Sequence, residues 1–196
     1  MGAYLYGPVH GFMIWNVFLA GIPAVLALAL FLTTRRRGAI WWAGFGAWVL
    51  FLPNAPYLLT DVVHMVHDIQ SASSDTWAYV VMATYGALFA FGLASYAFSL
   101  QLFRAFLHRT FADRLVAPAI LVVHALCVLA MYLGRFIRLN SWDVVTAPQR
   151  VATSVFRVPH PFTVAVLAVM FVIVGAGVFA TLAISDKLIA RARRLL

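Results

Sequence analysis

Charged residues are scarce in this sequence. Only 10% of its 196 residues are charged, whereas 64% are hydrophobic and the mean hydropathy is +0.95. A soluble domain of this size needs far more polar surface than this composition supplies. The composition therefore excludes a soluble globular protein and predicts an integral membrane protein.

Cysteine and glutamate are the rarest functional residues. Cys127 is the only cysteine, and all six acidic residues are aspartates. A single cysteine excludes a disulfide framework and a Cys-based zinc cluster within one chain. Cys127 lies inside an apolar run, so we expect a structural thiol. The N-terminus lacks an early basic region and a cleavage site, so no cleaved signal peptide is predicted.

Long apolar runs dominate the rest of the chain. A helix needs about 20 apolar residues to cross the hydrocarbon core of a membrane. Five windows meet or approach that length: Phe12–Leu32, Ile40–Leu59, Trp77–Phe103, Leu115–Leu133 and Phe162–Ile184. The predicted fold is an all-α polytopic membrane helix bundle of about five transmembrane helices, forming one domain over residues 1–196.

The net charge of +8 first suggests nucleic-acid binding, but the basic residues lie at the ends of apolar runs. Membrane topology already explains that placement, so nucleic-acid binding is not expected. With the N-terminus outside, ten of the fourteen basic residues are cytoplasmic: Arg35, Arg36, Arg37, Arg104, Arg109, Arg114, Lys187, Arg191, Arg193 and Arg194. Because cytoplasmic loops carry excess Lys and Arg, the predicted topology is N-terminus outside and C-terminus inside.

The stretch Pro53–Asp68, PNAPYLLTDVVHMVHD, interrupts an apolar run with prolines and then with ionisable residues. Prolines remove backbone donors, so the helix from Ile40 should stop or kink here, with Asn54 and Ala55 biased away from the α conformation. The residues after Thr60 predict a short amphipathic outer helix. At about 100° per residue, Asp61, His64 and Asp68 fall near one face of it.

Carboxylate and imidazole together suit zinc, manganese or iron. Asp61, His64 and Asp68 are therefore candidate ligands of a divalent metal, with Asp143 as a possible fourth group. The spacing matches no established metalloprotease pattern, since HExxH is absent. The alternative is that these groups bond to water, backbone or arginine.

A second polar stretch, Gly134–Asp143, follows the fourth apolar run. Arg135 and Arg138 are three residues apart, and guanidinium groups suit phosphate or carboxylate. We expect at least one of them to pair with an acid of the Asp61–Asp68 helix; direct contact with an anionic ligand is the alternative. A Ser141–His64–Asp61 hydrolase triad can also be written, but no GxSxG elbow surrounds the serine.

His124 falls near the middle of the fourth span, where an ionisable group is a functional candidate by default. A neutral imidazole bonded to a neighbouring helix is the simpler prediction. The spans carry too few further charges for a proton relay, which argues against a pump.

The two polar stretches also carry a family resemblance. Pro53–Tyr57, Thr60–Asp61 and His64, together with Tyr132–Phe136, Arg138 and Asn140–Asp143, resemble the bacterial integral membrane proteins of domain of unknown function 1361. The resemblance covers nearly the whole chain and implies a multi-pass bacterial inner-membrane protein, with no assigned activity.

Taken together, the residues predict an outward-facing polar site for an anionic or lipid-like ligand, with a divalent metal as the candidate cofactor. The expected ligand-binding residues are Asn54, Asp61, His64, Arg135, Arg138, Asn140 and Asp143. The expected partner is membrane lipid, and the sequence does not separate binding from catalysis. The alternative is a structural accessory subunit that packs against a larger membrane protein complex; a small transporter ranks last.

Overall fold

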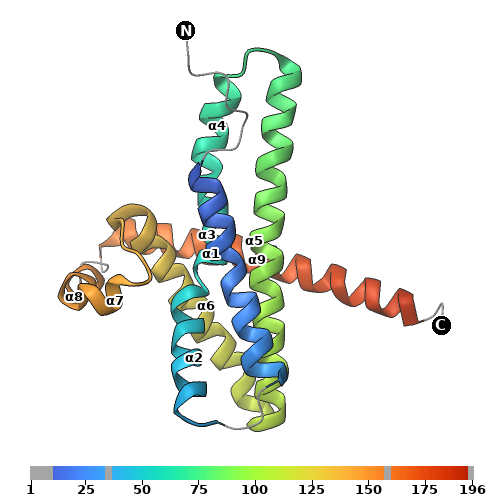
Figure 1. Ribbon diagram of the computed structural model, residues 1–196, viewed down its shortest axis with the longest axis vertical. Helices are drawn as coiled ribbons and strands as arrows, with labels where there is room; N and C mark the ends of the chain where they lie inside the picture. The colour runs from blue at the N-terminus through green and yellow to red at the C-terminus, as the bar shows by residue number, and fades with distance from the viewer. Residues whose placement is uncertain (1–10, 34–36, 157–159, 194–196) are drawn as a thin grey trace.

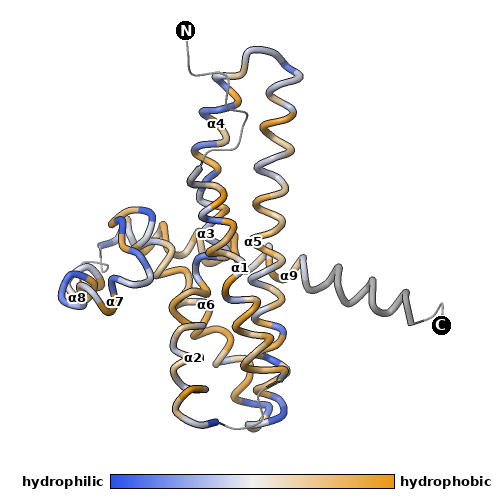
Figure 2. Tube along the Cα trace, viewed as in Figure 1, coloured by the Kyte–Doolittle hydropathy of each residue, from blue (hydrophilic) through white to orange (hydrophobic). Residues whose placement is uncertain are grey.

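The computed structural model describes residues 11–33, 37–156 and 160–193, which contain helices and no strands (Figure 1). Within these ranges, five helical stretches are long and apolar enough to cross a membrane: Met13–Leu32, Ala39–Gln70, Asp75–Thr110, Asp113–Ile137 and Pro161–Thr181. Hydrophobic residues fill the middle of the molecule, while hydrophilic ones gather at the chain turns and around α7 and α8 (Figure 2). The predicted all-α membrane fold is confirmed.

The first helix, α1 (Gly11–Ala27), continues into a π-helical segment, η1 (Leu28–Thr33), and packs along α5 (Asp75–Thr110). The contact uses small residues: Ala20 is fully buried, and its carbonyl oxygen accepts a 2.6 Å hydrogen bond from Ser95 Oγ. Small side chains let two membrane helices approach closely, so this seam ties the first helix to the longest one.

The second apolar stretch passes through four consecutive elements: α2 (Ala39–Phe51), α3 (Asn54–Tyr57), the 3₁₀ turn η2 (Leu58–Asp61) and α4 (Val62–Gln70). As predicted, α2 stops before Pro53. The expected bias of Asn54 and Ala55 away from the α conformation was wrong, because both belong to α3. Ala55 and Leu58 are fully buried, so packing in the bundle overrides the local preference of the prolines.

Aromatic rings from η1, α2 and the C-terminal part of α5 pack together at the end of the molecule opposite the α4–α5 turn. The ring of Phe31 lies 5.0 Å from that of Trp48 and 5.3 Å from that of Phe103. Trp41 is buried in this cluster, whereas Trp42 is exposed. Trp41 Nε1 donates to the carbonyl oxygen of Leu30, one of the backbone groups of the π-helical turn.

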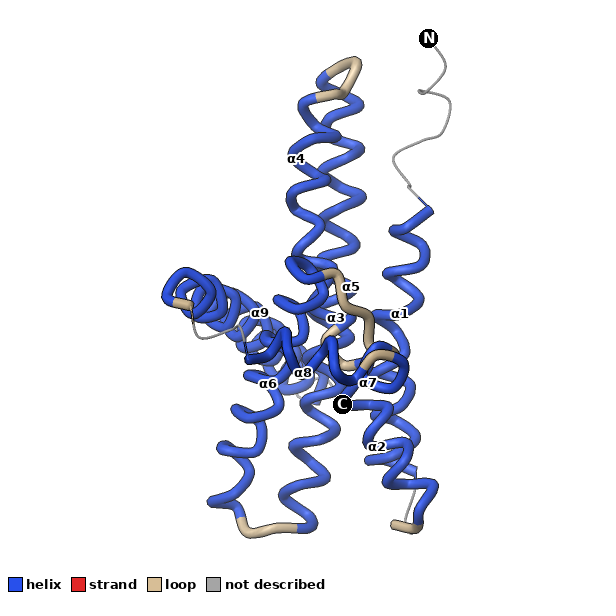
Figure 3. Tube along the Cα trace, turned by 90° about the vertical axis from the view of Figure 1, so that its left-hand side faces the viewer, coloured by secondary structure: helices blue, strands red, loops and turns tan. Residues whose placement is uncertain are grey.

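Ser74 caps α5 by accepting a 3.3 Å hydrogen bond from the backbone N–H of Trp77. At 36 residues, α5 is about 54 Å long and exceeds the predicted span at both ends. With α4 it forms a helical hairpin that rises above the rest of the molecule (Figure 3).

After η3 (Asp113–Leu115), α6 (Val116–Tyr132) ends in a second π-helical segment, η4 (Leu133–Ile137). Two short helices follow, α7 (Asp143–Thr146) and α8 (Pro148–Phe156), and lie to one side of the bundle (Figure 1).

The last helix, α9 (Pro161–Arg193), runs across the long axis of the others (Figure 1). It packs against α5 and α6, where Gly175 faces His124 and Gly177 faces Leu93. His124 is buried; its Nε2 lies 3.1 Å from the carbonyl oxygen of Phe171, and its Nδ1 lies 2.9 Å from the Tyr96 hydroxyl. A carbonyl oxygen only accepts, so Nε2 carries the hydrogen and Nδ1 accepts from Tyr96. His124 thus bonds to neighbouring helices, as predicted.

Candidate functional site

The site is built around the interrupted helix at α3. Prolines at 53 and 56 remove two backbone donors, so nearby carbonyl groups need other partners. Asn54 Nδ2 donates to the carbonyl oxygen of Phe51 at 2.9 Å, and the Ala55 N–H donates to that of Leu52 at 3.2 Å. Side chains and tighter turns of this kind allow an interrupted helix to persist inside a bundle. The break therefore presents polar groups between packed helices.

Asp61, at the end of η2, is the deepest charged group among the described residues, with 2% of its surface exposed. Asn16 Nδ2 on α1 donates to Asp61 Oδ2 at 3.3 Å. Arg135 Nη1, in η4, lies 3.7 Å from Asp61 Oδ1. The predicted pairing between an arginine of the second polar stretch and an acid of the first is thereby confirmed, and Arg135 is the arginine that makes it.

The remaining ionisable residues of α4 differ in burial. Asp68 Oδ2 accepts a 2.8 Å hydrogen bond from the Tyr85 hydroxyl on α5, while His64 and His67 are exposed. Within the described ranges, no three His, Cys, Asp or Glu side chains are grouped so that they could hold a metal ion. The geometry therefore adds no support to Asp61, His64 and Asp68 as metal ligands, and that assignment stays a prediction.

The chain reverses after η4 at Arg138, which has φ 61° and ψ 43°. It is the one non-glycine residue of the described chain with a positive φ, and a left-handed residue of this kind costs about 1–2 kcal/mol. The turn is closed by the backbone N–H of Leu139, which donates to the carbonyl oxygen of Leu133. It carries residues 139–142 back over the bundle.

Asp143 stabilises that returning segment. It is the first residue of α7, and its Oδ2 accepts a 2.7 Å hydrogen bond from the backbone N–H of Asn140, three residues earlier. Ser141 accepts a 3.0 Å hydrogen bond from Asn54 Nδ2 on α3. Ser141 is thus held by the first polar stretch, and the triad that the sequence permitted gains no support from this arrangement.

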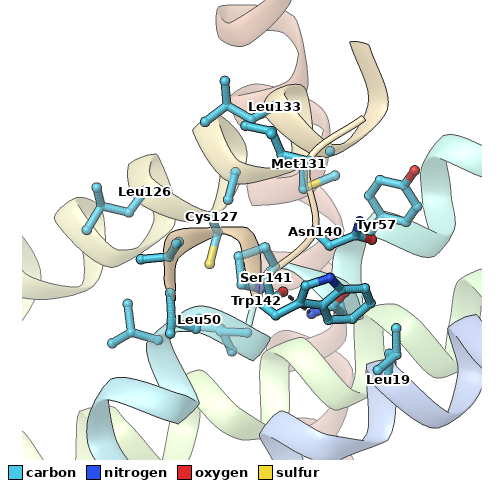
Figure 4. Close-up of a pocket in the computed structure, with 18 of the residues that line it drawn as sticks. Leu19, Leu50, Tyr57, Leu126, Cys127, Met131, Leu133, Asn140, Ser141 and Trp142 are labelled. Carbon is cyan, nitrogen blue, oxygen red and sulfur yellow. Dashed lines mark hydrogen bonds between the residues drawn. The ribbon is translucent and has the colours of Figure 1, made fainter. Parts of the chain in front are cut away.

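The two stretches enclose a pocket of about 460 Å³ (Figure 4). Its apolar wall comes mainly from α1, α2 and α6: Leu19, Val49, Leu50, Val123, Leu126, Cys127 and Met131. Its polar residues come mainly from α3 and the segment after η4: Asn16, Asn54, Tyr57, Arg138, Asn140 and Ser141.

The polar groups gather at one end of the pocket. Along α2 and α6, which run in the same direction, apolar lining residues come first and polar ones follow in α3 and after η4. Along α1, which runs the opposite way, Asn16 precedes Leu19 (Figure 1). Both orders place the polar groups at the same end, together with apolar lining residues such as Leu139 and Trp142, whereas the lining from α2 and α6 is apolar throughout.

Of the predicted ligand-binding residues, Asn54, Arg138 and Asn140 line the pocket. Asp61 and Arg135 form the neighbouring ion pair, Asp143 supports the wall, and His64 is exposed on α4. The sequence analysis missed the apolar wall, Tyr57 and Asn16. Asn16 carried a usable signal, because it is the one strongly polar side chain within the Phe12–Leu32 run.

Comparisons with curated proteins and with solved structures found no match. A family model does match the chain, over residues 15–176, and its description is "Protein of unknown function (DUF1361)". The matched region contains the whole pocket and both polar stretches. This multi-pass membrane protein belongs to the DUF1361 family of proteins of unknown function.

Proposed function

We propose that this protein binds an amphiphilic, lipid-like ligand in the pocket between α3 and the segment after η4. The observation that supports the proposal is the segregation of the lining, with an apolar wall toward α2 and α6 and polar groups at the other end. Ligand pockets of about 300–1,000 Å³ with a few convergent polar groups are typical binding sites. A ligand with a chain and a polar head matches both ends.

The proposal includes the cellular setting. We place the protein in the bacterial inner membrane with its N-terminus outside, so that the polar end of the pocket faces outward. The support is the excess of basic residues on the predicted cytoplasmic segments. Arg37, Arg104 and Arg109 all lie at the end of the molecule opposite the α4–α5 turn (Figure 1).

A divalent metal at Asp61, His64 and Asp68 remains a secondary part of the proposal, supported by the ligand types alone. The nearby Arg135 opposes a cation unless an anion accompanies it. Elemental analysis of the purified protein beside a His64→Ala, Asp68→Ala variant tests it. Equal, sub-stoichiometric metal in both proteins would remove the metal from the proposal.

The main test fills the pocket. Ala130 lines the pocket on α6, and Ala130→Phe should occupy the space of the ligand chain. Ala125, on the same helix, is exposed and does not line the pocket, so Ala125→Phe is the matched control. Lipids extracted from the purified proteins are compared by mass spectrometry. We expect an amphiphile enriched with wild type and Ala125→Phe and lost with Ala130→Phe; equal lipid profiles in all three would overturn the proposal.

The alternative of an accessory subunit predicts a different outcome of the same purification. Apolar side chains of α9 such as Phe162, Val172 and Phe179 are exposed, as they would be if a partner covered them. A protein partner that survives detergent extraction in fixed stoichiometry, with no enriched lipid, would favour the accessory subunit.

A further inference from the structure

The two arginines of the site differ in their partners. Arg135 is neutralised by Asp61 at 3.7 Å, whereas Arg138 lines the pocket and forms no ion pair with any described residue. Asp143, the other nearby carboxylate, accepts from the Asn140 backbone and has Thr146 Oγ1 at 3.5 Å. The pocket lining therefore carries one cation and no carboxylate. A guanidinium in such a place is suited to a carboxylate or phosphate oxygen.

The backbone adds an independent observation. The chain holds Arg138 in the left-handed conformation, although glycine or asparagine would adopt it at lower cost. Strained residues of this kind cluster at binding sites, where the surrounding structure maintains them. Here the turn brings Arg138, Asn140 and Ser141 into the lining of the same pocket.

The size of the pocket limits the apolar part of the ligand. At about 460 Å³ the pocket lies in the lower half of the range of about 300–1,000 Å³ that encloses drug-sized ligands. One alkyl chain of about a dozen carbons with a small head group is a ligand of that size. A two-chain phospholipid is larger than the ligands that pockets of this size enclose.

The rim indicates the route of entry. Trp15 on α1, Leu126 on α6 and Trp142 line the pocket and are 54%, 49% and 45% exposed. Trp15 and Leu126 lie in helices that are apolar enough to span the membrane. The exposed part of the lining therefore includes apolar side chains on membrane-spanning stretches, which suits a ligand that arrives from the bilayer.

We propose that the ligand is a single-chain amphiphile with one anionic head, a carboxylate or a phosphate, which enters from the bilayer and places its head on Arg138. This rests on the proposed function, because it specifies the ligand of the same pocket.

Binding of labelled probes to protein in neutral phosphatidylcholine nanodiscs, corrected for empty nanodiscs, tests the proposal. The probes are dodecyl phosphate, dodecanoate, dodecanol, inorganic phosphate and a two-chain phosphatidic acid. We expect one dodecyl phosphate or dodecanoate per chain, with at least tenfold weaker binding of dodecanol. Whichever anionic probe binds more tightly identifies the head group.

Variants separate the charge from the backbone turn. Arg138→Gln should weaken binding of the anionic probe at least tenfold, and Arg138→Lys should restore most of it. Arg114, exposed in η3 and outside the pocket lining, supplies the control Arg114→Gln, which should bind as wild type does. If Arg138→Lys fails to recover binding while Arg138→Gln is folded, the charge assignment is overturned.

The remaining outcomes are distinguishable. Equal binding of dodecanol and dodecyl phosphate, lost in Ala130→Phe, would preserve the amphiphile pocket and overturn the anionic head. Tight binding of inorganic phosphate alone, or equal binding of phosphatidic acid, would overturn the single-chain ligand from the bilayer. Binding of the probes that Ala130→Phe leaves unchanged would count against the proposed function itself.

Discussion

Asp61 keeps a carboxylate within the bundle because Asn16 and Arg135 reach it from two other elements. Removing one member of a buried pair leaves an uncompensated charge and typically costs about 3–5 kcal/mol. We therefore expect Asp61→Asn and Arg135→Gln each to destabilise the protein strongly. The double variant should lose at least 1 kcal/mol less than the sum of the two.

Equilibrium unfolding in detergent measures these free energies. A cycle of Asp61→Asn with Arg138→Gln is the matched control, because Arg138 belongs to the pocket and not to the ion pair. Additive losses in the Arg135 cycle, or an equal coupling in the Arg138 cycle, would contradict the assignment of Arg135 as the partner of Asp61.

Two serines one helical turn apart on α5 provide a second comparison. Ser95 is buried and donates to the carbonyl oxygen of Ala20, whereas Ser99 Oγ is fully buried without a hydrogen-bond partner among the described residues. A hydrogen bond between membrane helices contributes about 0.6–1.7 kcal/mol, while an unsatisfied buried hydroxyl is itself a cost. Ser95→Ala should lower the free energy of unfolding by about 1 kcal/mol, and Ser99→Ala should leave it unchanged or raise it.

The same detergent unfolding measurement checks both serines. An equal loss in the two variants would mean that packing of the helix, and not hydrogen bonding, sets the cost at this seam.

At the scale of elements, the site depends on close packing of α5 against α3. A Cβ at Gly92 would lie 2.4 Å from the carbonyl oxygen of Ala55 and 3.1 Å from Leu58 Cδ1, so the two helices would have to separate. Gly92→Ala should therefore destabilise the protein by about 1–3 kcal/mol and displace α3 from the pocket.

Gly86, also on α5, offers the control, since a Cβ there meets nothing within 4 Å. Gly86→Ala should be neutral or stabilising by up to about 1 kcal/mol, because alanine favours the helix. Thermal unfolding in detergent compares the two. A Gly92→Ala protein as stable as Gly86→Ala would show that α3 and α5 have room to separate.

The elements differ in how far the sequence could predict them. Apolar runs predicted all five stretches that are long and apolar enough to cross a membrane, because length and hydropathy are properties of local sequence. Asn54 and Ala55 were mispredicted because their conformation is set by the burial of α3 among α1, α5 and α6, which no local pattern reports. The path of α9 across the other helices depends on contacts at Gly175 and Gly177 that sequence periodicity does not orient.

The site was also only partly predictable from the sequence. Opposite charges in an apolar setting have few possible partners, so the pairing of Asp61 with an arginine followed from charge alone. Charge did not choose between Arg135 and Arg138, because that depends on the turn after η4. The apolar wall could not be predicted from the sequence, since residue types such as those at Val123 and Cys127 occur equally at lipid-facing and at packed positions of a membrane helix.

For the whole molecule, the orientation in the membrane decides which compartment the polar end of the pocket faces. Ser73 lies exposed in the turn between α4 and α5, and Gly38 lies exposed before α2, at the opposite end of the bundle. In a Cys127→Ser background, Ser73→Cys and Gly38→Cys each leave a single thiol. Most of the basic residues belong to the segments that the sequence predicts to be cytoplasmic, and Gly38 lies in one of them. We therefore expect an impermeant maleimide to label Ser73→Cys on intact cells and to label Gly38→Cys only after permeabilisation. Labelling of Gly38→Cys with protection of Ser73→Cys would reverse the orientation, and the polar end of the pocket would then draw its ligand from the cytoplasmic leaflet.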